Sequence, residues 1–134
     1  MQRLKGASIM SKFRPVTQYK GSKFVAQYHS AAFAALVNKV DPSHVAKVAR
    51  GERNTTGGWE FSYINRITSS HNSRHVTIRS IDGTILAKFK DTRVASEILS
   101  GVFGVEIPQI MLSNDTALYA LNGYARRHGG HTAL

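Results

Sequence analysis

Cysteine is absent from the sequence, which excludes disulfide bonds and thiolate metal sites. Proline is scarce, with three among 134 residues, and no long polar tract is present, so the composition is that of a folded chain. No apolar run approaches the roughly 20 residues that span a bilayer, and residues 1–16 lack the apolar core of a signal peptide. These absences predict one ordinary domain or two small ones, without a membrane segment, in the reducing cytoplasm.

Acidic residues are few, and they are unevenly placed. Eight Asp and Glu stand against eighteen Lys and Arg, giving a formal net charge of +10 and a pI near 10.3. A small protein this basic most often binds nucleic acid, and less often an anionic membrane or an acidic protein. Residues 1–14 contain four basic residues and no acid, whereas residues 76–126 contain five of each sign. The first half of the chain is therefore expected to meet a polyanion.

Two stretches of the chain share one pattern. Residues 16–37 and 76–99 each begin with alternating residues, pass a glycine turn and return through a second alternating run. This pattern is typical of a β-hairpin. Ser30 or Asp91 follows two residues after the last aromatic residue of each hairpin, and either side chain can cap the first helix.

A second helix is expected after each of these first helices. Pro42 and Pro108 follow a turn, and proline is well suited to the first position of a helix. Each stretch then closes on a glycine and an aromatic residue, Gly58-Trp59 or Gly123-Tyr124. These aromatic rings can stack on bases, but their place at the end of each stretch favours closing the core. The predicted fold class is α+β, with two tandem small units that each contain a β-hairpin, a helix-turn-helix and a closing aromatic residue.

The predicted helix that begins at Pro42 has two unlike faces. Val45 and Val48 are spaced for one apolar face, whereas polar and basic residues lie on another face and continue into the next loop. Arginine and asparagine can bind base edges with two hydrogen bonds, and lysine, serine and threonine mostly bind phosphates. A polar stripe on a short helix can also be only a solvated face. The candidate DNA-binding residues are Ser43, His44, Lys47, Arg50, Arg53, Asn54 and Thr55, together with Arg14, Lys20 and Lys23.

The first stretch carries a set of motifs at fixed spacing: a V-x-Q-Y opening, a glycine turn, a serine before the first helix, and paired glycines before an aromatic residue. The residues that form these motifs are Val16, Gln18, Tyr19, Gly21, Ser30, Val45, Val48, Gly51, Arg53, Thr55, Gly57, Gly58 and Trp59. In these residues the range 15–61 closely resembles the intron-encoded nuclease repeat, a DNA-binding module attached to homing endonucleases of phages and introns. Thr56 stands where alanine is usual, and the spacer between the glycines and the final aromatic residue is missing. The resemblance implies a phage-encoded helix-turn-helix module that binds DNA. It does not imply cutting, because the nuclease is a separate domain.

The chain shows no residues arranged for catalysis. His71 and His75 lie among serines and an asparagine, and His128 and His131 flank two glycines, so both pairs are expected on surface loops rather than around a metal ion. No Ser-His-Asp, P-loop or paired-carboxylate pattern is present. We therefore expect a protein that is not an enzyme, with no catalytic residue, no metal and no cofactor.

The second stretch differs from the first where DNA would be bound. Aligning Pro108 with Pro42 places Ile110 and Ser113 at the positions of His44 and Lys47, so the basic stripe is lost. A helix rich in apolar residues is buried against its own chain or against a partner. We expect it to pack on the first repeat or to form a partner surface, with Ile110 as the partner-binding residue of a homodimer or of a complex with a host protein.

The sequence predicts a non-catalytic protein that binds double-stranded DNA inside the bacterial host cell, as a regulator or a DNA-targeting adaptor. One alternative is a phage inhibitor that docks its basic surface on a host protein or ribonucleoprotein complex. Another is RNA binding, against which the lack of exposed aromatic clusters counts. The predicted organisation is a basic flexible arm (1–14), a DNA-binding repeat (15–61), a linker (62–75), a degenerate second repeat (76–126) and a tail (127–134).

Overall fold

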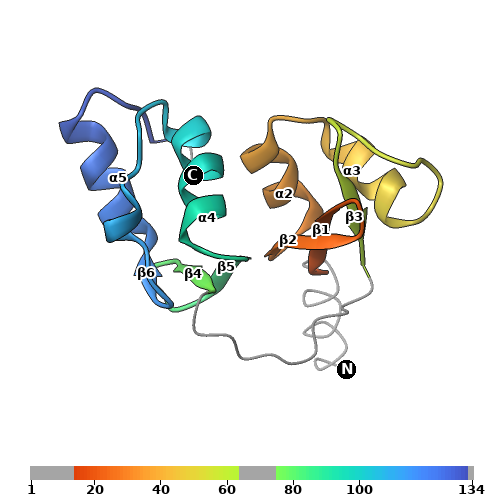
Figure 1. Ribbon diagram of the computed structural model, residues 1–134, viewed down its shortest axis with the longest axis horizontal. Coiled ribbons are helices and arrows are strands. Elements are labelled where there is room, and N and C mark those ends of the chain that lie inside the picture. Colours follow the sequence, from red (N-terminus) through yellow and green to blue (C-terminus); the bar gives the residue numbers. More distant parts are fainter. Residues whose placement is uncertain (1–13, 64–74, 133–134) are drawn as a thin grey trace, which may run out of the picture.

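The computed structural model describes residues 14–63 and 75–132 of the chain, so most of the predicted arm and linker lie outside the described residues. Strands and helices follow one another in two similar runs (Figure 1). The first run comprises β1 (Val16–Lys20), β2 (Lys23–Tyr28), α2 (Ala31–Asn38), α3 (Pro42–Ala49) and β3 (Glu60–Ser62). The second comprises β4 (Val76–Arg79), β5 (Ile85–Phe89), α4 (Thr92–Phe103), the 3-10 helix η1 (Gln109–Met111), β6 (Thr116–Ala117) and α5 (Leu118–Arg127).

One sheet contains all the described strands. It has six strands in the order β3-β1-β2-β5-β4-β6, so β2 and β5 meet at its centre. They pair antiparallel, with Ala26 opposite Phe89 and Tyr28 opposite Ala87. At the edges, β3 pairs antiparallel with β1, whereas β6 pairs parallel with β4. The predicted α+β class is confirmed, and the division into two tandem units stays a prediction, because the sheet is continuous through both hairpins.

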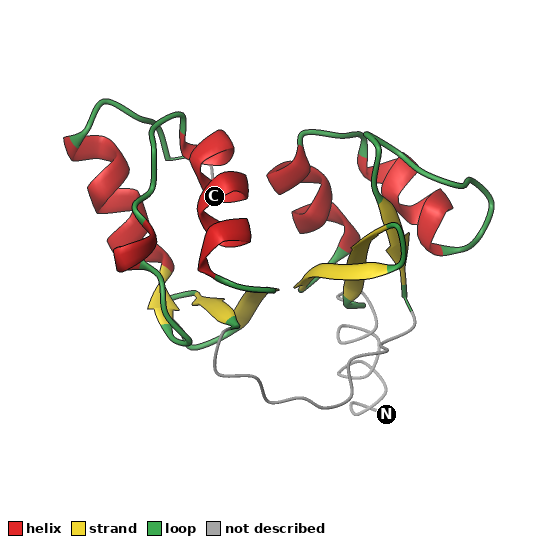
Figure 2. Cartoon of the chain, viewed as in Figure 1, coloured by secondary structure: helices red, strands yellow, loops and turns green. Residues whose placement is uncertain are grey.

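The helices cover one face of this sheet (Figure 2). The first helix after each hairpin, α2 or α4, lies near the centre, where the two helices contact each other. The last helix of each run, α3 or α5, lies on the outer flank, where α3 contacts β3 and α5 contacts β6 (Figure 1). Each flanking helix is therefore held beside an edge strand of the sheet.

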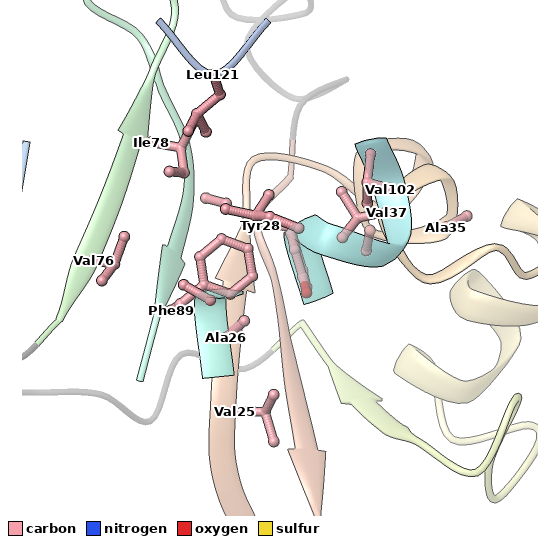
Figure 3. Close-up of a cluster of buried hydrophobic side chains, with 14 of the residues drawn as sticks. Val25, Ala26, Tyr28, Ala35, Val37, Val76, Ile78, Phe89, Val102 and Leu121 are labelled. Carbon is pink, nitrogen blue, oxygen red and sulfur yellow. The ribbon is translucent and has the colours of Figure 1, made fainter. Parts of the chain in front are cut away.

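Tyr28 lies at the centre of the core and is 1% exposed (Figure 3). Its ring stands edge-on to Phe89 of β5, with 5.9 Å between the centroids. Its hydroxyl donates to Gln18 Oε1 at 2.6 Å and accepts from Asn38 Nδ2 at 3.4 Å. Burial raises the pKa of the Tyr28 phenol and the Asn38 hydrogen bond lowers it by less, so the hydroxyl stays a donor at neutral pH. One side chain therefore joins both hairpins and the end of α2.

The predicted helix starts in the first half are confirmed. Ser30 caps α2 by accepting from the amide of Phe33 at 3.1 Å, and Pro42 occupies the start of α3. In the second half Asp91 caps α4 by accepting from the amide of Val94 at 2.9 Å. A side-chain oxygen at this position satisfies an amide that has no partner within the helix.

The predicted helix from Pro108 is wrong. Pro108 precedes only the single turn of η1, and α5 begins ten residues later, at Leu118. Between them the side chains compete with a helix for the backbone: Thr116 Oγ1 accepts from the Ser113 amide at 2.9 Å, and Ser113 Oγ accepts from the Asp115 amide at 3.2 Å. Thr116 also pairs with β4 in the sheet.

The alignment of the second run therefore needs two further corrections. Ile110 and Ser113 do not lie on a second helix, since the chain is extended at Leu112 and leads into β6. Gly123 and Tyr124 lie inside α5 and do not follow a helix. Leu112 and Ile107 are buried, so this connection packs on the core by its own apolar residues.

No helix in residues 14–63 and 75–132 combines the length and the apolar character needed to cross a bilayer.

Replacing Tyr28 with Phe should destabilise the fold. The ring is kept, but Gln18 Oε1 loses its shortest hydrogen bond in a buried setting, which typically costs about 1–3 kcal/mol. The free energy of unfolding, measured in urea, should fall by that amount. Tyr119→Phe is the matched control, because Tyr119 is 67% exposed and removing its hydroxyl should leave the free energy of unfolding unchanged. Equal stability of both variants would contradict the importance of the buried network.

Candidate nucleic-acid interface

The start of α3 is fixed by Asp41. Its carboxylate accepts from the Ser43 amide at 2.8 Å and from the Ser43 hydroxyl at 2.7 Å. These hydrogen bonds lower the pKa of Asp41, so the carboxylate is charged at neutral pH. Val45 and Val48 of the same helix are buried, as their spacing predicted. The exposed side of α3 therefore begins with a negative charge, and the hydroxyl of Ser43 is already engaged.

The other end of α3 carries the basic residues. Lys47 lies in its last turn and Arg50 follows as the C-terminal cap. Arg50 makes two hydrogen bonds to Glu52, with Nε to Oε2 at 2.7 Å and the terminal nitrogen to Oε1 at 3.3 Å. Arg50 lowers the pKa of Glu52, first by the hydrogen bond and then by its charge. Both side chains are about half exposed, and an ion pair in that setting contributes little to stability. A phosphate or a base could therefore replace Glu52 as the partner of Arg50.

The loop after α3 has a defined shape. Thr56 and Trp59 exchange two backbone hydrogen bonds of 3.0 Å each, which closes the segment between them into a tight turn. Gly57 and Gly58 adopt positive φ values of 62° and 82° there. A Cβ on Gly57 would lie 2.8 Å from Val40 Cγ1, so this glycine is required both by its backbone and by its packing against the turn between α2 and α3.

Arg53, Asn54 and Thr55 form the exposed part of this loop. Arg53 Nε donates to the carbonyl of Thr55 at 2.9 Å, which bends the loop back on itself. The candidate DNA-binding residues that follow α3 thus lie together on one short loop. All three of these side chains are exposed to solvent.

Two basic side chains lie over aromatic rings beside β3. Lys20 Nζ is 4.8 Å from the centroid of the Trp59 ring, and Arg14 Cζ is 4.1 Å from that of Tyr63. Trp59 is half-buried and packs against the core, and the same holds for Tyr124 in α5, as predicted for both rings. Because β1 and β3 are antiparallel, Lys20 and Arg14 lie at opposite ends of this edge.

The structure brings most predicted residues together and leaves others apart. The predicted residues between 43 and 55 lie on one continuous stretch, α3 and the loop after it, in which His44 is half-buried. The contact of Lys20 with the Trp59 ring places the end of β1 beside this stretch. Lys23 lies opposite Lys20 in the hairpin register. Arg14 lies at the far end of β1. Ile110 is on η1 in the second half, where it is 93% exposed, away from this surface.

The histidines have separate surroundings. His71 lies outside the described residues. The ring of His75 is tilted against Phe24 at 5.6 Å, and that of His128 stacks on Tyr124 at 4.0 Å. The amide of His131 donates to the carbonyl of Phe103 at 2.9 Å. In the described parts of the chain no three histidine, aspartate or glutamate side chains gather to hold a metal ion.

The last helix lies later in the chain than the sequence pattern predicts. Arg126 and Arg127 lie in the last turn of α5 and are exposed, although the sequence placed them at the end of a repeat and in a tail. The available signal was the charge of the segment, because no acidic residue follows Asp115. The glycine at 123 concealed it, since glycine is expected to end a helix rather than to lie within it.

Comparison of the chain with models of known families, with curated proteins and with solved structures finds no match. The resemblance to the intron-encoded nuclease repeat therefore stays a prediction.

Replacing Gly57 with Ala should unfold the loop or destabilise the first half. Alanine at positive φ costs about 1–2 kcal/mol, and contact with Val40 adds an overpacking cost of about 1–3 kcal/mol. Gly51→Ala is the matched control: it has a φ of 87° but open space around a Cβ, so only the backbone cost applies. Urea denaturation should show the larger loss for Gly57→Ala. A larger loss for Gly51→Ala would contradict the packing role of Gly57.

Proposed function

We propose that the protein binds double-stranded DNA through α3 and residues 50–58, and that it catalyses no reaction. The observation that carries this proposal is the group of basic and amide side chains between Lys47 and Asn54, with Glu52 as its one acid, on a helix end and a loop of defined shape. Such a surface matches a polyanion, and the net charge of +10 favours one as the partner.

The geometry favours the C-terminal end of α3 as the end that meets DNA. Asp41 places a negative charge at the N-terminal end, where it would repel phosphates, and it already holds the hydroxyl of Ser43. Lys47 is the expected phosphate contact, because its ammonium group is a point charge without directional preference. Arg50 and Asn54 are the expected base contacts, since both can form two parallel hydrogen bonds.

The proposed biological role is that of a phage-encoded regulator or DNA-targeting adaptor inside the bacterial cell. No triad, P-loop or paired-carboxylate motif in the sequence points to a reaction. Lys20, Lys23 and Arg14 would extend the contact along the DNA backbone, with Lys20 held in place by the Trp59 ring.

A protein partner is the second candidate. The observation behind it is the nearly full exposure of Ile110 on η1, a large apolar side chain that a partner could cover. Such a partner would meet the second half of the chain, either as another copy of this protein or as a host protein. It is compatible with DNA on the first half.

Binding to duplex DNA should depend steeply on salt. Each phosphate that the protein neutralises releases counterions and contributes about −0.9 to the slope of log affinity against log salt. Fluorescence anisotropy at several salt concentrations should show this slope for duplex DNA, with weaker binding of single-stranded DNA and of RNA hairpins. An affinity for duplex that does not change with salt, or tighter binding of RNA, would refute the proposal.

Replacing Glu52 with Gln should tighten binding. The change removes the carboxylate that competes for Arg50, and because such an exposed pair is weak, an increase of up to about fivefold in affinity is expected. Glu97→Gln on α4 is the matched control, because it changes the net charge equally and also releases an exposed arginine, Arg93. An equal increase in DNA affinity in both variants would mean that the effect comes from net charge alone. Weaker binding of Glu52→Gln would show that Glu52 orients Arg50 for the contact.

A further inference from the structure

α5 occupies the place in the second half that α3 occupies in the first. Each half of the sheet consists of a hairpin next to the central β2–β5 pair and an edge strand outside it. Each half also has a central helix and a flanking helix that lie over these strands (Figure 1). α3 contacts the edge strand β3, and α5 contacts the edge strand β6. The two flanking helices thus lie at opposite ends of one sheet, each against an edge strand of the same chain.

The exposed side of α5 is basic and aromatic. Arg126 and Arg127 are exposed in its last turn, and Tyr119 is 67% exposed in its first turn. Residues 116–134 contain no acid, and neither arginine forms an ion pair with the part of the chain that the structure describes. Guanidinium and phenol groups bind phosphate oxygens well, so this surface is complementary to a DNA backbone.

Gly123 lies in the middle of α5, and the fold itself does not require a glycine there. It is not among the glycines with positive φ. A Cβ would meet only the end of the Arg127 side chain, at 3.3 Å from its terminal nitrogen, and that flexible side chain can move. Glycine weakens a helix interior relative to alanine, and one use that offsets this cost is the close approach of a ligand to the backbone. Gly123 therefore leaves room for a partner to lie close to the backbone of α5, beside the exposed arginines.

We propose that α5 is a second DNA-contacting helix, so that one chain holds two segments of the same duplex. This inference rests on the proposed function of α3. The six strands place β3 and β6 five spacings of about 4.8 Å apart, which is about 24 Å, and the flanking helices lie above these edges. That separation is shorter than the roughly 34 Å between successive major grooves on one side of a duplex, so α3 and α5 would contact segments less than one helical turn apart.

The two helices carry different chemistry, so their roles differ. α3 and its loop offer arginine and asparagine, which can select bases, whereas α5 offers arginine, tyrosine and a glycine that lets the DNA backbone come close. α5 therefore contributes affinity and orientation, and α3 contributes the choice of sequence. A protein seated on α5 is the competing occupant, and the following experiment separates the two.

The test uses the full chain and a duplex of about 30 base pairs, roughly three helical turns. Gly123→Ala should raise the melting temperature of the free protein, because alanine favours the helix, and should weaken duplex binding several-fold. Gly101→Ala is the matched control, since Gly101 is an exposed glycine of α4 with open space around it. It should also raise the melting temperature, with unchanged DNA binding.

Arg126→Gln tests where on the duplex α5 makes its contact. Hydroxyl-radical footprinting of the wild type should show two protected segments on the duplex, and this variant should lose protection at one of them and reduce the salt slope by about 0.9. Lys47→Ala should weaken protection at the other segment. A wild type that binds no duplex would refute the function proposed for α3. A wild type that binds with a single protected segment, and equal affinities for wild type, Gly123→Ala and Arg126→Gln, would refute the role of α5 alone.

Discussion

Tyr28 is the side chain on which the arrangement of the whole sheet and its helices depends. Its ring packs edge-on against Phe89 across the central pair of strands, and its hydroxyl bonds to Gln18 of β1 and to Asn38 at the end of α2. A buried hydroxyl has a high cost unless it is paired, and here both partners are provided by other elements. The core therefore has one favoured arrangement of the two hairpins and α2, rather than several of similar energy.

The same network determines where the candidate interface lies. Asn38 bonds to the carbonyl of Ala34 as well as to Tyr28, which holds the last turn of α2 against the sheet. The chain then turns through Lys39 in the left-handed region and reaches Asp41, which caps α3. Val40, within that turn, packs against Gly57 of the loop after α3. The core thus positions both the helix and the loop that carry the basic side chains.

The two flanking helices hold similar places in the fold but carry different side chains. Both flanking helices lie beside edge strands, but α3 begins with a charged aspartate and ends at the Arg50–Glu52 pair, whereas α5 lacks a side-chain cap and ends in two exposed arginines. A single duplex that spans both flanks would meet base-reading groups on one side and phosphate-binding groups on the other. Under the proposed function, this difference would let a chain of 134 residues combine affinity with sequence choice.

Local chemistry made the first half of the chain and the start of α4 predictable from the sequence. The caps Ser30 and Asp91, the proline at the start of α3 and the glycine turns act through atoms only a few residues away, so their patterns predict the elements correctly. The pairing of β2 with β5 and the late start of α5 were decided by the tertiary structure. Both depend on contacts between residues far apart in the chain, Tyr28 with Ala87 and Thr116 with Ile78, and these strand pairings leave no local pattern. Local hydrogen bonds of Ser113 and Thr116 also delay the start of α5. For this reason the sequence indicated the basic face of α3, and only the folded chain placed Arg126 on the opposite flank.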